Sequence, residues 1–156
     1  MAEKYDSYKD TQEHIRLVQN YLLLIAKELI DRSLVHDKSK LEPPEKSIFD
    51  EVTPKLKGLT YGSEEYKASL KEMGGALQHH YRYNSHNPEH YGNGIDGMDI
   101  ADLVEMICDW GAATMRHDDG DINISIEKNQ ERFKYDDSLK SILSNTVNRF
   151  KMGKQK

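Results

Sequence analysis

The sequence has little cysteine and no long apolar run. Cys108 is the single cysteine among 156 residues, so an intrachain disulfide framework is excluded and a reducing compartment is favoured. The longest apolar run, residues 21–26, is far shorter than the roughly 20 residues that cross a bilayer. The first six residues are charged and lack the apolar segment of a signal peptide. These absences predict a cytoplasmic protein without membrane association.

An excess of positive charge is also missing. The net charge is -5 and the isoelectric point about 5.8, which argues against a basic surface that binds duplex nucleic acid. The one basic cluster, residues 151–156, is expected to be a flexible, solvated tail. At 18.0 kDa the chain is long enough for one domain, residues 1–156, with a hydrophobic core.

No segment shows the strict alternation of a half-buried strand, whereas helical periodicity recurs along the chain. A helix is expected to start at Pro43-Pro44-Glu45, and Pro54 to stop or kink it. Ser63 begins a helix with a weak point at Gly74-Gly75. The other helices are expected near 11–32, 99–116, 125–133 and 138–150, and a loop is expected at 84–97. The sequence therefore predicts an all-α bundle of about five to seven helices, with the domain core at about 11–150.

The arrangement of the histidines is the most informative pattern. Together with two aspartates, six of them follow the order His, His-Asp, His-His, His, His, Asp along the chain. Imidazole and carboxylate groups are ligands of divalent metals and also serve acid–base chemistry. The residues of interest are His14, His36, Asp37, His79, His80, His86, His90 and Asp109. A second pair, His117-Asp118, lies beside a polar turn without other ligands at suitable spacing, and we set it aside.

Asp109 lies in the most apolar part of the predicted helix 99–116, between Cys108 and Trp110. Burying an unpaired carboxylate costs several kcal/mol, so Asp109 needs a partner. A metal ion, a protonated histidine or a salt bridge, for which Arg116 is a candidate, would meet this need. His36 and Asp37 follow the first helix; in a helical or turn conformation their side chains diverge by about 100°, so both can reach one ion, or Asp37 can bridge two. The alternative is a capping aspartate beside a surface histidine.

His14, His36-Asp37 and Asp109 resemble the pattern of the HD-domain superfamily, which consists of metal-dependent phosphohydrolases with a helical core. Three segments, 36–41, 86–91 and 102–110, resemble more closely a small uncharacterised phage and bacterial family within it. The resemblance covers residues 11–150. It implies a divalent ion (Mn, Fe, Co, Ni, Zn or Mg) held by His14, His36, Asp37 and Asp109. It also implies hydrolysis of a phosphate ester such as a nucleotide or a nucleotide-derived signal.

Some superfamily members hold a second ion through two further histidines, and here His80 with His86 or His90 would fill that role. We expect one ion in preference to two. Pro88 separates His86 from His90, because proline begins a helix and its predecessor avoids the α region. Only one side chain of His79-His80 can face the ion, and we favour His80. Substrate contact or packing is an equal alternative for each of these four histidines.

One departure from the superfamily concerns the residues after the His-Asp pair. Many nucleotidases of the superfamily have a glutamate there, whereas this chain has Lys38, Ser39 and Lys40. Besides Asp37, the predicted catalytic residues are Lys38 and Lys40, which can hold a phosphate, and Arg116 as a phosphate clamp. Glu42 or Glu45 would supply the missing carboxylate. The alternatives are a non-catalytic module with a structural or lost metal, and a dinuclear-iron oxygenase. A homo-oligomer is compatible with the sequence.

Overall fold

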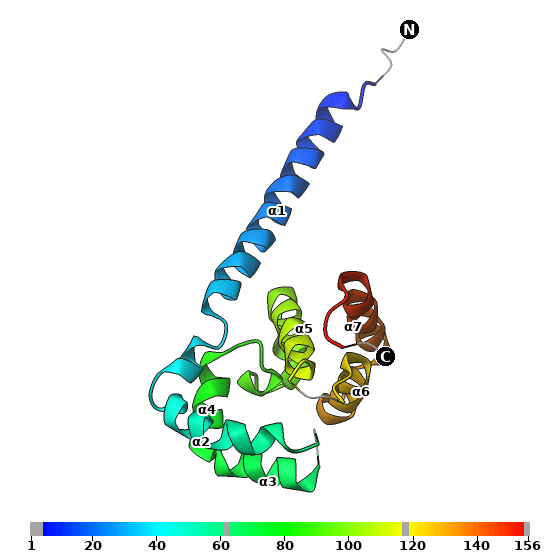
Figure 1. Ribbon diagram of the computed structural model, residues 1–156. Helices are drawn as coiled ribbons and strands as arrows, with labels where there is room; N and C mark the ends of the chain where they lie inside the picture. Colours follow the sequence, from blue (N-terminus) through cyan, green and yellow to red (C-terminus); the bar gives the residue numbers. More distant parts are fainter. Residues whose placement is uncertain (1–4, 61–62, 117–118, 155–156) are drawn as a thin grey trace. The chain divides into compact units, whose positions relative to one another are not determined.

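The computed structural model describes residues 5–60, 63–116 and 119–154, and confirms the predicted all-α fold. Within these residues there are seven α-helices, three short 3-10 helices and no strand. The chain divides into two compact units, residues 1–35 and residues 36–156, which are described separately below (Figure 1). His117 and Asp118 lie outside the described residues.

The first unit is essentially one long helix, α1, Tyr8–Val35. It extends the predicted helix by three residues at each end. Ion pairs between residues four apart, Lys27–Asp31 and Glu28–Arg32, support its C-terminal half. His14 lies in the second turn of α1, one turn before Val18.

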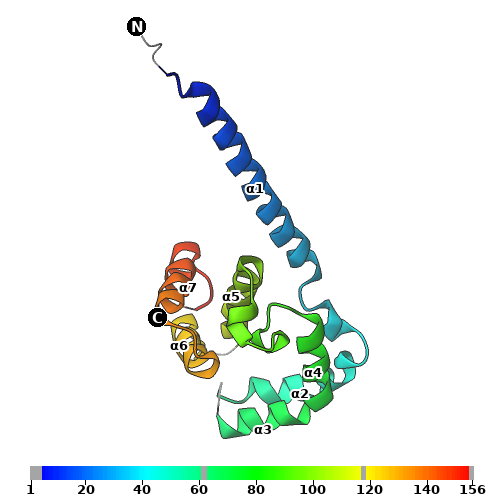
Figure 2. The ribbon, with the colours of Figure 1, turned by 180° about the vertical axis from the view of Figure 1, so that it is seen from behind.

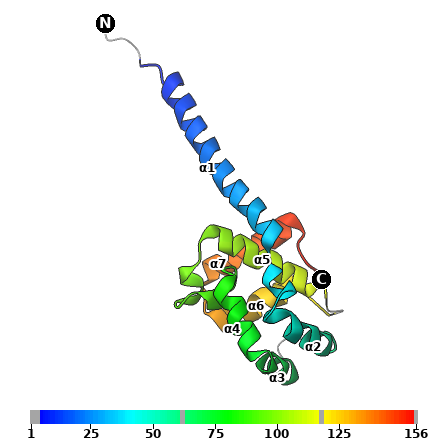
Figure 3. The same cartoon turned by 90° about the vertical axis from the view of Figure 1, so that its left-hand side faces the viewer.

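The second unit begins with a 3-10 helix, η1 (Lys38–Leu41), followed by α2 (Glu45–Lys57), α3 (Glu64–Glu72) and α4 (Gly74–Tyr83). Helix α2 packs against both α3 and α4, and Figures 1 and 3 show the three together at one end of this unit. Pro54 does not stop α2, which runs three residues further to Lys57. The predicted helix from Ser63 to Tyr83 is divided after Met73, where Gly74 has φ +24°.

The region predicted as a loop contains two further 3-10 helices, η2 (Pro88–His90) and η3 (Gly94–Gly97). Helix α5 (Ile100–Thr114) follows, and Asp99 caps it as predicted, in a reciprocal capping box with Asp102. Asp102 is buried and accepts hydrogen bonds from the hydroxyls of Ser85 and Tyr91. These bonds attach the connecting segment to α5, the helix that carries Glu105 and Asp109.

Helices α6 (Ile122–Phe133) and α7 (Asp137–Phe150) pack against α5 and against each other (Figure 2). Their contact forms the main hydrophobic core, which includes Met106, Ile107, Ile122, Ile126, Leu143 and Val147. Residues 151–156 were expected to be a flexible tail, but part of this segment makes a contact here: the carbonyl of Lys154 accepts a hydrogen bond from the amide of Ile122. Among the described residues, no helix combines the length and apolar character needed to cross a bilayer.

Candidate metal centre

The second unit brings together five of the predicted metal ligands. His36 and Asp37 precede η1, His80 lies in the last turn of α4, His86 lies between α4 and η2, and Asp109 lies on α5. Three groups of side chains have ligand atoms close enough to share an ion: His36–Asp37–Asp109, Asp37–His80–His86 and His36–His86–Glu105. Asp37 belongs to the first two groups and is therefore central to the cluster.

The backbone of Asp37 is in the left-handed region, with φ 56° and ψ 13°. Aspartate tolerates this conformation better than most residues with a Cβ atom, and such conformations concentrate at functional sites. Its Oδ2 atom lies 2.5 Å from Nζ of Lys40. Its Oδ1 atom is buried and has no hydrogen-bond partner among the described residues. A buried carboxylate oxygen without a partner calls for an explanation such as an ion or water.

The distances within the cluster are those of atoms arranged around an ion. Oδ1 of Asp37 lies 3.3 Å from Nε2 of His80 and 3.5 Å from Nε2 of His86. Nε2 of His36 lies 3.6 Å from Oδ2 of Asp37 and 3.6 Å from Oδ1 of Asp109. Ligand atoms that each lie about 2.1 Å from one ion are roughly 3.0–3.5 Å apart in octahedral or tetrahedral geometry. The described side chains therefore fit a divalent ion.

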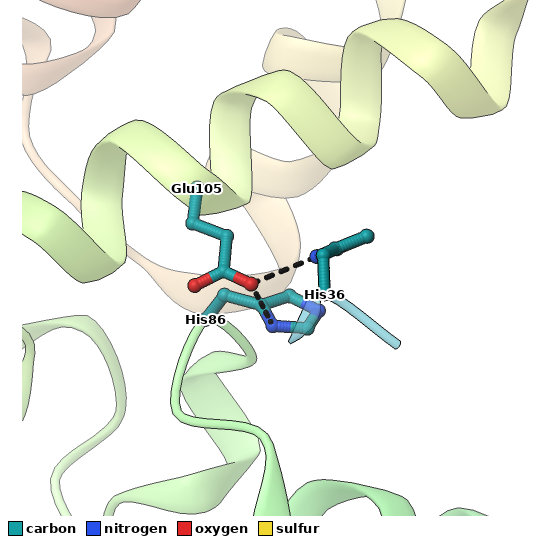
Figure 4. A group of neighbouring side chains, drawn as sticks. All are labelled: His36, His86 and Glu105. Carbon is teal, nitrogen blue, oxygen red and sulfur yellow. Dashed lines mark hydrogen bonds and ion pairs between the residues drawn. The ribbon is translucent and has the colours of Figure 1, made fainter. Parts of the chain in front are cut away.

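Glu105, on α5, was not predicted as part of the site. Its Oε1 atom lies 2.8 Å from Nδ1 of His36 and 3.2 Å from Nδ1 of His86, as Figure 4 shows. The contact with His36 is a hydrogen bond and the contact with His86 is a close ion-pair contact, so direct contacts to Nδ1 explain the group His36–His86–Glu105 better than a third ion does. The one signal in the sequence was the position of Glu105 one helical turn before Asp109.

Glu45, at the start of α2, has a fully buried side chain. Its Oε1 atom lies 2.7 Å from Nδ1 of His79, and its Oε2 atom lies 3.0 Å from Nδ1 of His80. The hydroxyl of Ser39 also donates to Oε2. Glu45 thus supplies a carboxylate near the site. This carboxylate faces Nδ1 of His79 and of His80, whereas Nε2 of His80 faces Asp37. Glu42, the other candidate for this role, is exposed.

The charges around His36 and Asp109 shift their pKa values in opposite directions. The carboxylates of Asp109 and Glu105 raise the pKa of His36 to about 10. Burial alone would raise the pKa of Asp109, but His36, Lys40 and His86 outweigh burial and lower it. Burial and the charge of Lys40 lower the pKa of His80, which favours its neutral form. A neutral imidazole is the form that binds a metal.

Other predicted residues lie elsewhere. His90 is exposed and its Nδ1 contacts the carbonyl of Tyr81 at 2.8 Å, so it does not join the cluster. Lys38 is exposed as well. His14 belongs to the first unit, whose position relative to the second is not determined, so its role as a ligand stays a prediction.

A cavity of about 510 Å³ adjoins the cluster. Lys40, His80 and Asp109 line it on the side of the cluster, and the predicted phosphate clamp, Arg116, also lines it. Aromatic and apolar side chains form much of the remaining wall, among them Phe49, Tyr66, Leu70, Tyr81, Trp110 and Phe133. A cavity with an apolar wall and a few polar groups beside perturbed titratable residues is typical of a small-molecule site.

Fold and site together define a helical protein with a candidate histidine–carboxylate metal centre. The chain belongs to a family described as a family of unknown function, DUF5662, whose model matches residues 3–150. No curated protein and no solved structure matches the chain.

Proposed function

We propose that this protein is a metal-dependent phosphohydrolase of the HD-domain type that acts in the cytoplasm on a small phosphate ester. The observation that carries the proposal is the buried Oδ1 atom of Asp37, which lacks a hydrogen-bond partner among the described residues and faces Nε2 atoms of two buried histidines. The resemblance of His14, His36-Asp37 and Asp109 to the superfamily pattern supports the same conclusion.

Asp37 would hold the ion together with His36 and Asp109 on one side, or with His80 and His86 on the other. His14 would complete the first set, as the resemblance implies. We expect one ion rather than two. In the alternative, the two carboxylate oxygens of Asp37, which belongs to both groups, bridge two ions. When bound, a divalent ion supplies Lewis-acid activation of water and neutralises charge on a phosphoryl group.

The cavity beside the cluster provides groups that bind a phosphate ester. Lys40 contacts Asp37 through Nζ and also lines the cavity, where its ammonium can pair with a phosphate oxygen. The guanidinium of Arg116 lines the same cavity and offers a planar pair of donors. The aromatic wall suits an ester with a flat organic group, so a nucleotide or nucleotide-derived signal is the substrate class we propose.

The test is a phosphatase screen over nucleotides and cyclic dinucleotides with Mn²⁺, Co²⁺, Fe²⁺, Ni²⁺, Zn²⁺ and Mg²⁺. Asp37→Asn is the inactivating variant, because asparagine keeps the left-handed backbone while removing the charge. Asp96→Asn, at an exposed position of η3, is the matched control. Activity in wild type and control that is lost in Asp37→Asn supports the proposal. Activity that persists in Asp37→Asn belongs to something else.

The screen also separates the other functions that the sequence allows. An ion bound with no turnover of any phosphate ester would indicate a structural ion in a non-catalytic module. Oxygen uptake with the iron-loaded protein would indicate an oxygenase.

A further inference from the structure

The three histidines of the cluster, His36, His80 and His86, share one arrangement, in which a glutamate faces Nδ1 and an aspartate faces Nε2. Nδ1 of His36 and of His86 faces Oε1 of Glu105, whereas Nδ1 of His80 faces Oε2 of Glu45. The Nε2 atom of each ring faces Asp37, and that of His36 also faces Asp109. Two carboxylates behind the rings therefore accompany two carboxylates in front of them.

The amide of Asn87 indicates which nitrogen of His86 lacks a proton. Its Nδ2 atom lies 3.1 Å from the carbonyl oxygen of Asn84, which identifies it as the donor end of the amide. The same atom lies 3.2 Å from Nε2 of His86 and 3.4 Å from Nε2 of His80. One hydrogen of this amide is used by Asn84, so the second can bond only one of the two ring nitrogens, and the shorter contact is the one to His86. A donor placed against Nε2 of His86 requires a lone pair there, so the proton of that ring lies on Nδ1.

Asn84 and Ser39 give the same result for His80. Nδ2 of Asn84 lies 2.8 Å from the carbonyl oxygen of His80 and 2.9 Å from Oγ of Ser39, and these two bonds use both of its hydrogens. Ser39 then donates its own hydrogen to Glu45. Neither residue has a hydrogen left for Nδ1 of His80, which is therefore the donor to Glu45.

We propose that Glu45 and Glu105 are positioning residues: each accepts a hydrogen bond from Nδ1 of a cluster histidine and so directs the Nε2 lone pair toward Asp37. The inference deepens the proposed function, since it identifies the groups that prepare the histidines for an ion. Carboxylates behind metal-bound histidines orient the ring and raise its basicity, and their loss typically lowers metal affinity about 10- to 100-fold.

The test reads the protonated nitrogen of each ring directly. Two-bond ¹H–¹⁵N spectra of the full chain assign the tautomers of His80 and His86 in the metal-free protein, and that of His36 in the Zn²⁺-loaded protein. In wild type we expect a proton on Nδ1 in all three. In Glu105→Ala, His86 should lose the preference for a proton on Nδ1, while His80 keeps it. In Glu45→Ala, His80 should lose this preference, while His86 keeps it. Glu51→Gln, which changes an exposed glutamate of α2, should alter neither.

Zn²⁺ affinity is the second measurement. We expect Glu105→Ala and Glu45→Ala to bind Zn²⁺ about 10- to 100-fold more weakly than wild type, and the Gln variants to recover part of the loss, because an amide oxygen still accepts a hydrogen bond. If the Ala variants do not fold, the wild-type tautomers and the Zn²⁺ affinities of the Gln variants carry the test. Protons on Nε2 in the wild-type rings, or tautomers unchanged in the folded Ala variants, would overturn the inference. The tautomers of His80 and His86 need neither metal nor turnover, so this result is independent of whether the protein hydrolyses a phosphate ester.

Discussion

Stabilisation by an added ion is the most direct measure of the metal centre, and it should depend on Asp37. An ion at about 100 times its dissociation constant adds about 2.7 kcal/mol to the free energy of unfolding, provided that it binds only the folded protein. For a chain of 156 residues, each kcal/mol raises Tm by roughly 2–4 °C. Wild type should therefore gain about 5–11 °C with saturating Mn²⁺, Co²⁺ or Zn²⁺ in differential scanning fluorimetry.

Asp37→Asn should lose most of this gain, because Asp37 belongs to both the group His36–Asp37–Asp109 and the group Asp37–His80–His86. Its Oδ1 atom is also the buried oxygen without a hydrogen-bond partner among the described residues. The exposed variant Asp96→Asn should keep it. Calorimetric titration of the same three proteins gives dissociation constants independently of Tm. A wild type whose Tm does not respond to any of these ions would refute the metal centre. An equal response in Asp37→Asn would place the ion elsewhere.

Three further predictions concern individual side chains. His80→Gln and His86→Gln should each weaken metal binding, whereas His90→Gln should not, because His90 is exposed and contacts the carbonyl of Tyr81; titration calorimetry distinguishes the two results. Lys40→Met should raise KM for a phosphate ester, because Lys40 contacts Asp37 and lines the cavity, while Lys38→Met at an exposed position should leave KM unchanged; a KM raised by neither change would exclude both lysines as phosphate ligands. The pKa of His36 is raised from its ordinary 6.5 to about 10, so its charged form stabilises the folded metal-free protein; this contribution is complete below pH 6.5 and is lost as the pH rises through 10. Urea unfolding between pH 7 and 10 should therefore show a steeper loss of stability in wild type than in His36→Gln, and parallel profiles would contradict this assignment.

Local chemistry explains why most helix ends could be predicted. Asp99 and Ser63 cap the helices that follow them, because each side chain accepts a hydrogen bond from a backbone amide of the first turn. Of the two effects predicted for Pro54, the stop is wrong, since α2 continues three residues beyond it. Proline blocks a hydrogen bond to the preceding turn but does not prevent the chain from completing one further turn. Tertiary contacts with α3 and α4 can retain such a turn, and a local pattern does not reveal them.

The inner part of the site was more predictable than its support. His36, Asp37 and Asp109 could be identified because their residue types and order along the chain resemble the HD-domain pattern. Glu45 and Glu105 are two among many glutamates, and their roles depend on which rings the fold brings against them. Glu45 lies 35 residues before His80 and Glu105 lies 69 residues after His36, so no local spacing connects them. Only the three-dimensional arrangement assigns these two carboxylates to the site.

The charge of the cluster is the strongest physical reason to expect a cation there. Four carboxylates, those of Asp37, Glu45, Glu105 and Asp109, meet around the three rings, and two cations, Lys40 and protonated His36, face them. Two formal negative charges are left in surroundings where desolvation makes unpaired charge costly. A fold that needed only to be stable would gain by replacing some of these groups with apolar side chains. The presence of these charged side chains is explained if a divalent ion neutralises the cluster. The proton on His36 would then be the one that the ion displaces.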